Sequence, residues 1–77
     1  MITLTTKEIR KAIQDHIPVG VEMYSSSGVR TWLLEKVFDY DVWIRGDHCG
    51  IVVKAMAKQG FFSTYRTQTG TIVYVRN

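Results

Sequence analysis

The chain has 77 residues, a formal net charge of +3, 45% apolar residues and one cysteine. A chain of this length forms one domain, 1–77, with a small core and little room for a deep catalytic cleft. One cysteine excludes an internal disulfide framework and a cysteine-based zinc site. No apolar run approaches the roughly 18 residues of a membrane span. We therefore expect a soluble, cytoplasmic, non-enzymatic protein that uses no cofactor and binds no membrane.

Charge is distributed unevenly along the chain. Residues 1–44 contain five basic and six acidic residues, a net charge of −1, whereas residues 45–77 contain five basic residues and only Asp47, a net charge of +4. A basic half of this kind favours contact with a polyanion. The same charges also fit an ordinary solvated surface, so charge alone does not decide between the two.

The first predicted helix covers residues 6–16. Thr5 and Glu8 have the spacing of a capping box, in which each side chain accepts a hydrogen bond from the other residue's backbone. Pro18 follows the helix and prevents its continuation. The apolar residues recur at helical spacing and form one stripe: Ile9, Ala12, Ile13 and Ile17.

A short strand and a second helix are predicted next. Apolar and other residues alternate over residues 19–24, which is typical of a half-buried strand. The serines and glycine of 25–28 indicate a break with several possible N-caps. Helical spacing then predicts a helix at about 28–38, in which Trp32 is large enough to anchor the core.

The segment 39–46 fits either a short strand or an irregular connector. Asp47 after it has the character of an N-cap, and Gly60 lies where a left-handed residue ends a helix. A third helix is therefore expected between them. Its two faces are predicted from the helical spacing, one with Val52, Ala55 and Met56 and the other with Ile51, Lys54 and Lys58.

The C-terminal residues predict a β-hairpin. Segments 61–66 and 71–76 are rich in strand-forming residues, and the polar turn 67–70 between them ends in a glycine. We expect three apolar side chains to pack inward: Phe62, Val73 and Val75. Four others are expected to be at least partly exposed to water: Tyr65, Arg66, Tyr74 and Arg76.

This order of helix, strand, helix, connector, helix and hairpin resembles that of winged helix-turn-helix DNA-binding domains. The likeness is carried by residues 52–62, where the third helix ends in a glycine and an apolar residue, and by the hairpin segments 65–66 and 71–75. It implies an α+β fold, a small three-helix domain with a C-terminal hairpin. One departure is the connector 39–46, because a helix-turn-helix usually has a turn of about three or four residues.

The resemblance implies a regulatory or accessory protein whose third helix enters the major groove of duplex DNA while the hairpin touches the backbone or the minor groove. Lys54 and Lys58 would lie one turn apart and neutralise phosphates or reach a guanine edge. With five basic residues a monomer would bind weakly, so we expect a homodimer or a second DNA-binding protein. The expected DNA-binding residues are Arg45, His48, Lys54, Lys58, Tyr65, Arg66, Gln68 and Arg76.

A second hypothesis is a small protein-binding module, such as the accessory or inhibitor proteins of phages and mobile elements. Tyrosine and tryptophan are favoured anchors of protein interfaces, and the chain has more of them than a small core can bury. The expected partner-binding residues are Tyr24, Tyr40, Trp43, Tyr65 and Tyr74. Single-stranded nucleic acid stacked on the hairpin tyrosines is a third, weaker hypothesis.

Catalysis and metal binding have little support in the sequence. Asp39, Asp41, Asp47, His48 and Cys49 are close in sequence but lack the spacing of a zinc site. Turn and capping roles explain the three aspartates without a metal. We therefore expect no catalytic residue and no metal site.

Overall fold

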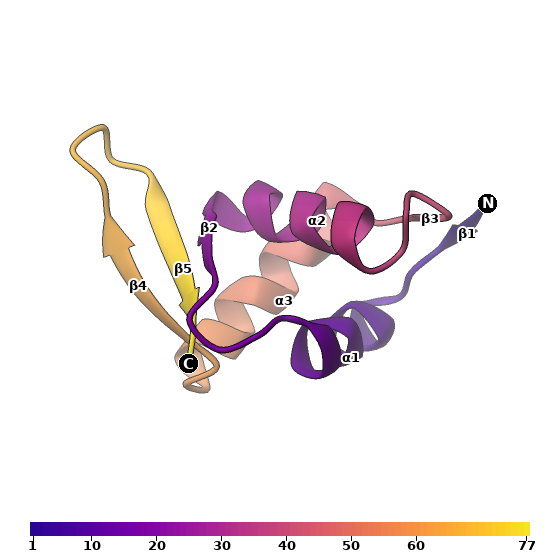
Figure 1. The fold of residues 1–77 in the computed structure, drawn as a ribbon, viewed down its shortest axis with the longest axis horizontal. Coiled ribbons are helices and arrows are strands. Elements are labelled where there is room, and N and C mark those ends of the chain that lie inside the picture. The colour runs from indigo at the N-terminus through magenta and orange to yellow at the C-terminus, as the bar shows by residue number, and fades with distance from the viewer.

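The computed structural model describes residues 1–77 and contains three helices, a three-stranded antiparallel sheet and a two-stranded parallel pair (Figure 1). The predicted α+β class is confirmed. None of the helices has the length and apolar character that crossing a membrane requires. The elements in chain order are β1 (Ile2–Thr3), α1 (Thr6–His16), β2 (Glu22–Tyr24), α2 (Ser25–Lys36), β3 (Val42–Trp43), α3 (Gly46–Lys58), β4 (Phe62–Arg66) and β5 (Ile72–Arg76).

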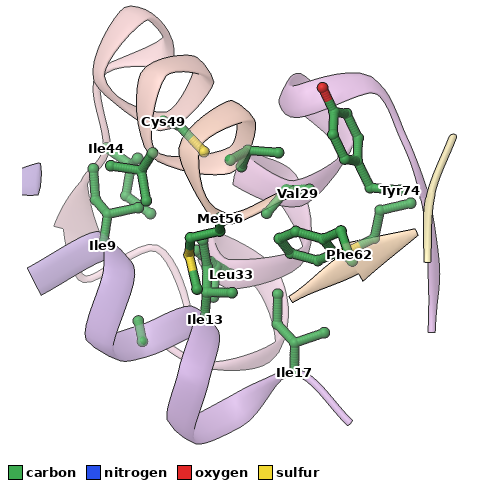
Figure 2. Close-up of a cluster of buried hydrophobic side chains, with 14 of the residues drawn as sticks. Ile9, Ile13, Ile17, Val29, Leu33, Ile44, Cys49, Met56, Phe62 and Tyr74 are labelled. Carbon is green, nitrogen blue, oxygen red and sulfur yellow. The ribbon is translucent and has the colours of Figure 1, made fainter. Parts of the chain in front are cut away.

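Helix α1 has the predicted bounds and the predicted capping box. The Thr5 hydroxyl accepts a hydrogen bond from the Glu8 amide at 3.2 Å, and the Glu8 carboxylate accepts one from the Thr5 amide at 3.0 Å. Ile9 and Ile13 are fully buried. They point from α1 into a core that also takes side chains from α2, α3 and β4 (Figure 2).

The hairpin is confirmed, and β2 extends it into a sheet with the order β2-β5-β4. The sequence did not predict the pairing of β2 with β5. The strand proposed for 19–24 is shortened to Glu22–Tyr24, and Val19 before it is 76% exposed. In the turn between β4 and β5, Gly70 has a φ of +88°, a conformation that glycine adopts without steric cost.

The two faces of the sheet differ from those predicted at three residues. Val73 and Val75 were expected to pack inward with Phe62, but the register of β4 and β5 places both on the opposite face of the sheet, where Val73 is nevertheless fully buried. The third residue is Tyr74. This residue is 4% exposed, and its ring packs edge-to-face against Phe62 with the ring centroids 5.7 Å apart (Figure 2). Its backbone partner on β2 is the buried Met23, so Tyr74 belongs to the face that covers the helices. The expectation that Tyr74 is partly exposed was wrong, because β2 makes β5 a central strand.

Helix α2 begins and ends earlier than predicted, at Ser25 and Lys36 instead of about 28 and 38. The serines form its first turn and not a break, because Ser25 has a positive φ of +64° that turns β2 directly into the helix. Shortly after the C-terminal end of α2, positive φ angles at Asp39 and Tyr40 change the direction of the chain. Trp32 is only partly buried, and Leu33 beside it occupies the core.

The connector contains the short strand β3, which was one of the two predicted alternatives. It pairs in parallel with β1, whose presence the sequence did not predict. Arg30 of α2 makes two contacts with this connector. Its Nε donates a hydrogen bond to the Ile44 carbonyl oxygen at 2.5 Å, and its guanidinium carbon lies 4.4 Å from the centre of the Trp43 ring. Trp43 therefore has a structural partner within the chain.

Helix α3 begins at Gly46, with Arg45 and not Asp47 at the N-cap position, and no side chain caps it. Its buried residues are Cys49, Val52, Val53 and Met56. The buried face is therefore rotated from the predicted one, and Ala55 is only half-buried. The predicted end is confirmed, since Gly60 has a φ of +90°.

The capping box gives a test of the fold. Replacing Thr5 with alanine leaves the Glu8 amide without its acceptor, so we expect the free energy of unfolding to fall by about 1 kcal/mol. Urea denaturation followed by circular dichroism measures the change. Thr6→Ala is the matched control at an exposed neighbour that makes no such bond, and it should change stability by less than about 0.5 kcal/mol. Equal effects would contradict the role of the capping box.

Candidate nucleic-acid interface

Helix α3 presents an exposed stripe on the side opposite its buried residues. The stripe recurs at helical spacing and consists of Asp47, Ile51, Lys54 and Lys58, all exposed. We call it the α3 stripe. Its C-terminal half carries two positive charges, and its N-terminal half carries one negative charge.

Lys54 of this stripe and Arg66 at the end of β4 line the same surface groove, although they are twelve positions apart in the chain. We call it the α3–hairpin groove; its volume is about 340 Å³. Its walls come from α3, the start of α2 and the hairpin. The lining residues are Ser25, Ser26, Lys54, Arg66, Gly70, Thr71, Ile72 and Tyr74.

The protein has three surface hollows, and the α3–hairpin groove has the most positively charged lining of the three. It contains two cationic side chains and no carboxylate. Each of the other two hollows is lined by two carboxylates, Glu8 and Asp15 in one and Glu22 and Glu35 in the other. The α3–hairpin groove is therefore the hollow that best suits an anion.

The positive charges around this groove are not neutralised within the chain. The protein has two salt bridges, Lys11 with Asp15 and Arg45 with Asp47, and neither uses a groove residue. Arg66 is oriented by a hydrogen bond of 3.0 Å from Nη1 to the carbonyl oxygen of Gly70. This bond holds the guanidinium against the hairpin turn and leaves its other N–H groups available.

Arg45 and His48, at the start of α3, are less suited to bind DNA. Arg45 donates to both carboxylate oxygens of Asp47, at 3.0 and 2.8 Å. This pairing raises the pKa of Arg45 and lowers the pKa of Asp47, so both groups stay charged and offset each other. His48 is half-buried, and its Nδ1 is buried without a hydrogen-bond partner.

The other predicted DNA-binding residues, Tyr65, Gln68 and Arg76, lie at different places on the hairpin. Gln68 is exposed in the turn, close in sequence to Arg66. Tyr65 lies on the opposite face of β4 from Arg66 and donates to a Glu22 carboxylate oxygen at 2.5 Å, a bond that raises the pKa of Tyr65. Arg76 lies at the far end of β5, over the ring of Phe61 at 5.1 Å. Neither Tyr65 nor Arg76 lines the groove.

Sequence reasoning missed three polar residues of the groove, Ser25, Ser26 and Thr71. The serines were interpreted as a break between elements, and Thr71 as the start of a strand. They meet only because β2 pairs with β5, so no local pattern could have placed them together.

The aromatic residues of the protein-binding hypothesis separate into two groups. Tyr24 and Tyr65 are 60% and 48% exposed and flank Val73 on the outer face of the sheet. Tyr40 and Trp43, 53% and 49% exposed, lie in the connector. Figure 1 places the sheet and β3 at opposite ends of the molecule. Tyr74 is buried and cannot anchor a partner.

Cys49 is fully buried in the contact of α3 with α2. Its thiol donates a hydrogen bond to the Ser26 carbonyl oxygen, with Sγ 3.7 Å from that oxygen. Burial raises the pKa of the thiol to about 11, against a smaller opposing effect of the Arg30 charge. The thiol is therefore neutral and shielded. No group of three histidine, cysteine or acidic side chains is placed to hold a metal ion.

Comparison with known proteins adds no relative: no family model, no curated protein and no solved structure matches this chain.

The buried thiol predicts a pH dependence of stability. The pKa of Cys49 is raised from its ordinary value of 9.0 to about 11 in the folded state, so the unfolded chain loses its proton first as pH rises. The stabilisation that the buried neutral thiol contributes is fully present below pH 9.0. It is lost as the pH rises from 9.0 to about 11. We expect a loss on the order of 2 kcal/mol from this group.

Urea denaturation at several pH values between these limits measures the loss. Cys49→Ala is the comparison, because it keeps every other titrating group. Its stability should fall less steeply with pH than that of the unchanged protein. Parallel curves for the two proteins would show that the thiol is not shielded in the folded state.

Proposed function

We propose that this protein is a non-enzymatic DNA-binding protein of the winged-helix type, regulatory or accessory in role, that contacts duplex DNA through α3 and the C-terminal hairpin. The observation that carries the proposal is the α3–hairpin groove, where Lys54 and Arg66 line one hollow without a carboxylate. The order α1, β2, α2, α3, β4, β5 is the order on which the resemblance to winged-helix domains rests.

The chemistry of the groove suits a backbone phosphate. The guanidinium of Arg66 can donate two parallel N–H bonds to phosphate oxygens, and Lys54 adds a point charge from the opposite wall. Hydroxyl groups of Ser25, Ser26 and Thr71 supply further donors of the kind that contact DNA phosphates. Lys58, one turn beyond Lys54 on the α3 stripe, can reach a neighbouring phosphate.

The long connector before α3 is compatible with this proposal. Residues 42–43 form β3, which pairs with β1, and Arg30 donates a hydrogen bond to the carbonyl oxygen of the next residue, Ile44. Helices α2 and α3 still pack closely, because a Cβ at Gly50 would lie 3.6 Å from Ser26 Oγ. The extra residues therefore form a separate strand and do not push the two helices apart.

Three cationic side chains without a salt-bridge partner determine how strongly we expect the protein to bind DNA. Lys54, Lys58 and Arg66 would each displace about one counterion, which gives a modest, salt-sensitive affinity for one copy. A regulatory protein of this kind gains affinity when two copies bind adjacent half-sites. We therefore include a homodimer on DNA, in the cytoplasm, in the proposal.

Protein binding through the exposed aromatics is the alternative function. A stable protein interface buries roughly 800 Å² on each partner. The aromatics lie in two groups at opposite ends of the molecule (Figure 1), and Trp43 is engaged by Arg30. The groove gives a more concentrated site, so we prefer the DNA-binding proposal.

Fluorescence anisotropy with short random-sequence duplex DNA, at several salt concentrations, tests the proposal. We expect binding that weakens steeply with salt. Lys54→Ala and Arg66→Ala should each weaken it and reduce the slope of log K against log salt by about one. The double variant should reduce the slope by about two.

Lys7→Ala is the matched control, because Lys7 is an exposed cation of α1 that does not line the groove. It should leave affinity and slope nearly unchanged. Absence of binding at low salt, or equal losses for Lys7→Ala and Lys54→Ala, would contradict the proposal.

A further inference from the structure

Ile51 is the one apolar side chain of the α3 stripe. It is 65% exposed, and it is the one large apolar side chain on any of the three helices that is exposed to this degree. Isoleucine is also a poorer helix former than alanine, lysine or glutamate, because its branched Cβ loses rotamer freedom. An exposed helical position thus gains nothing in stability from isoleucine.

The position of Ile51 relates it directly to the proposed phosphate contacts. Lys54 lies three residues further along the same stripe, which places it about 4.5 Å along the helix axis. A phosphate held by Lys54 and Arg66 would fix the register of α3 on the duplex. Ile51, on the outward side of the helix, would then face the base edges and not the backbone.

We propose that Ile51 is a specificity-determining residue that contacts the C5-methyl group of a thymine in the major groove. This inference rests on the proposed function. An isoleucine side chain has no donor or acceptor, so it cannot read the hydrogen-bonding pattern of a base edge. The thymine methyl group is the apolar feature that the major groove presents.

The neighbours of Ile51 on the stripe do not compete for this role. Asp47, one turn before it, could accept a hydrogen bond from cytosine, but both of its carboxylate oxygens are occupied by Arg45. Lys54, one turn after it, faces the groove with Arg66. Base discrimination at the centre of the stripe is therefore left to an apolar contact.

The test begins with selection of duplexes from a random pool by the unchanged protein, followed by sequencing. We expect at least one invariant thymine. Each thymine of the selected duplex is then replaced singly by deoxyuridine, which lacks only the methyl group. At one position we expect the replacement to weaken binding by a factor of roughly three to ten, the effect of burying one methyl group.

The variant Ile51→Ala makes the test specific to this side chain. It should remain folded, because the side chain is exposed, and circular dichroism verifies this. The variant should keep the salt slope of the unchanged protein, since Lys54 and Arg66 remain. Its affinity should no longer distinguish thymine from deoxyuridine at the sensitive position.

The outcomes separate the two proposals. Salt-sensitive binding without an enriched thymine, or an unchanged deoxyuridine effect in Ile51→Ala, overturns the role of Ile51 and leaves DNA binding intact. Absence of any binding by the unchanged protein at low salt overturns the proposed function, and the role of Ile51 with it.

Discussion

The pairing of β2 with β5 is the contact on which the rest of this structure depends. It joins the first half of the chain to the hairpin and places Met23 opposite Tyr74. Because β5 becomes central, Tyr74 is buried against Phe62 and the sheet gains an inner face that covers the helices. The same pairing brings the start of α2 beside the hairpin turn, which creates one wall of the α3–hairpin groove.

Arg30 has a comparable role at the other end of the molecule. Its hydrogen bond to Ile44 and its stacking on Trp43 hold the connector, while β1 pairs with β3 on the other side. These contacts fix the entry into α3, which has no side-chain cap of its own. The orientation of the α3 stripe therefore depends on a cation–aromatic contact distant from the proposed DNA site.

The distribution of charge matters more for the proposed function than its total. The basic half of the chain holds five cations, but they differ in what surrounds them. Arg45 is paired with Asp47, and Arg76 lies over Phe61. Lys54, Lys58 and Arg66 form no salt bridge. A small net charge can thus support a localised anion-binding surface, provided that the free cations are gathered on one side.

Local sequence patterns predicted the regular elements well. Thr5 and Glu8 defined the start of α1, Gly60 defined the end of α3, and the glycine-containing turn defined the hairpin, because each signal depends on residues within one or two turns. The patterns failed at the start of α2, where a positive φ at Ser25 continues β2 into a helix. No spacing rule describes such a junction.

By itself, the sequence determined the three helices, the hairpin and the excess of positive charge in the C-terminal half. Only the tertiary structure decided which of those charges meet. Lys54 and Arg66 lie on separate elements, and Ser25 is far from both in the chain, so their convergence follows from long-range strand pairing and helix packing. Likewise, helical spacing placed Ile51 beside Lys54, but only burial of the opposite face of α3 leaves Ile51 exposed.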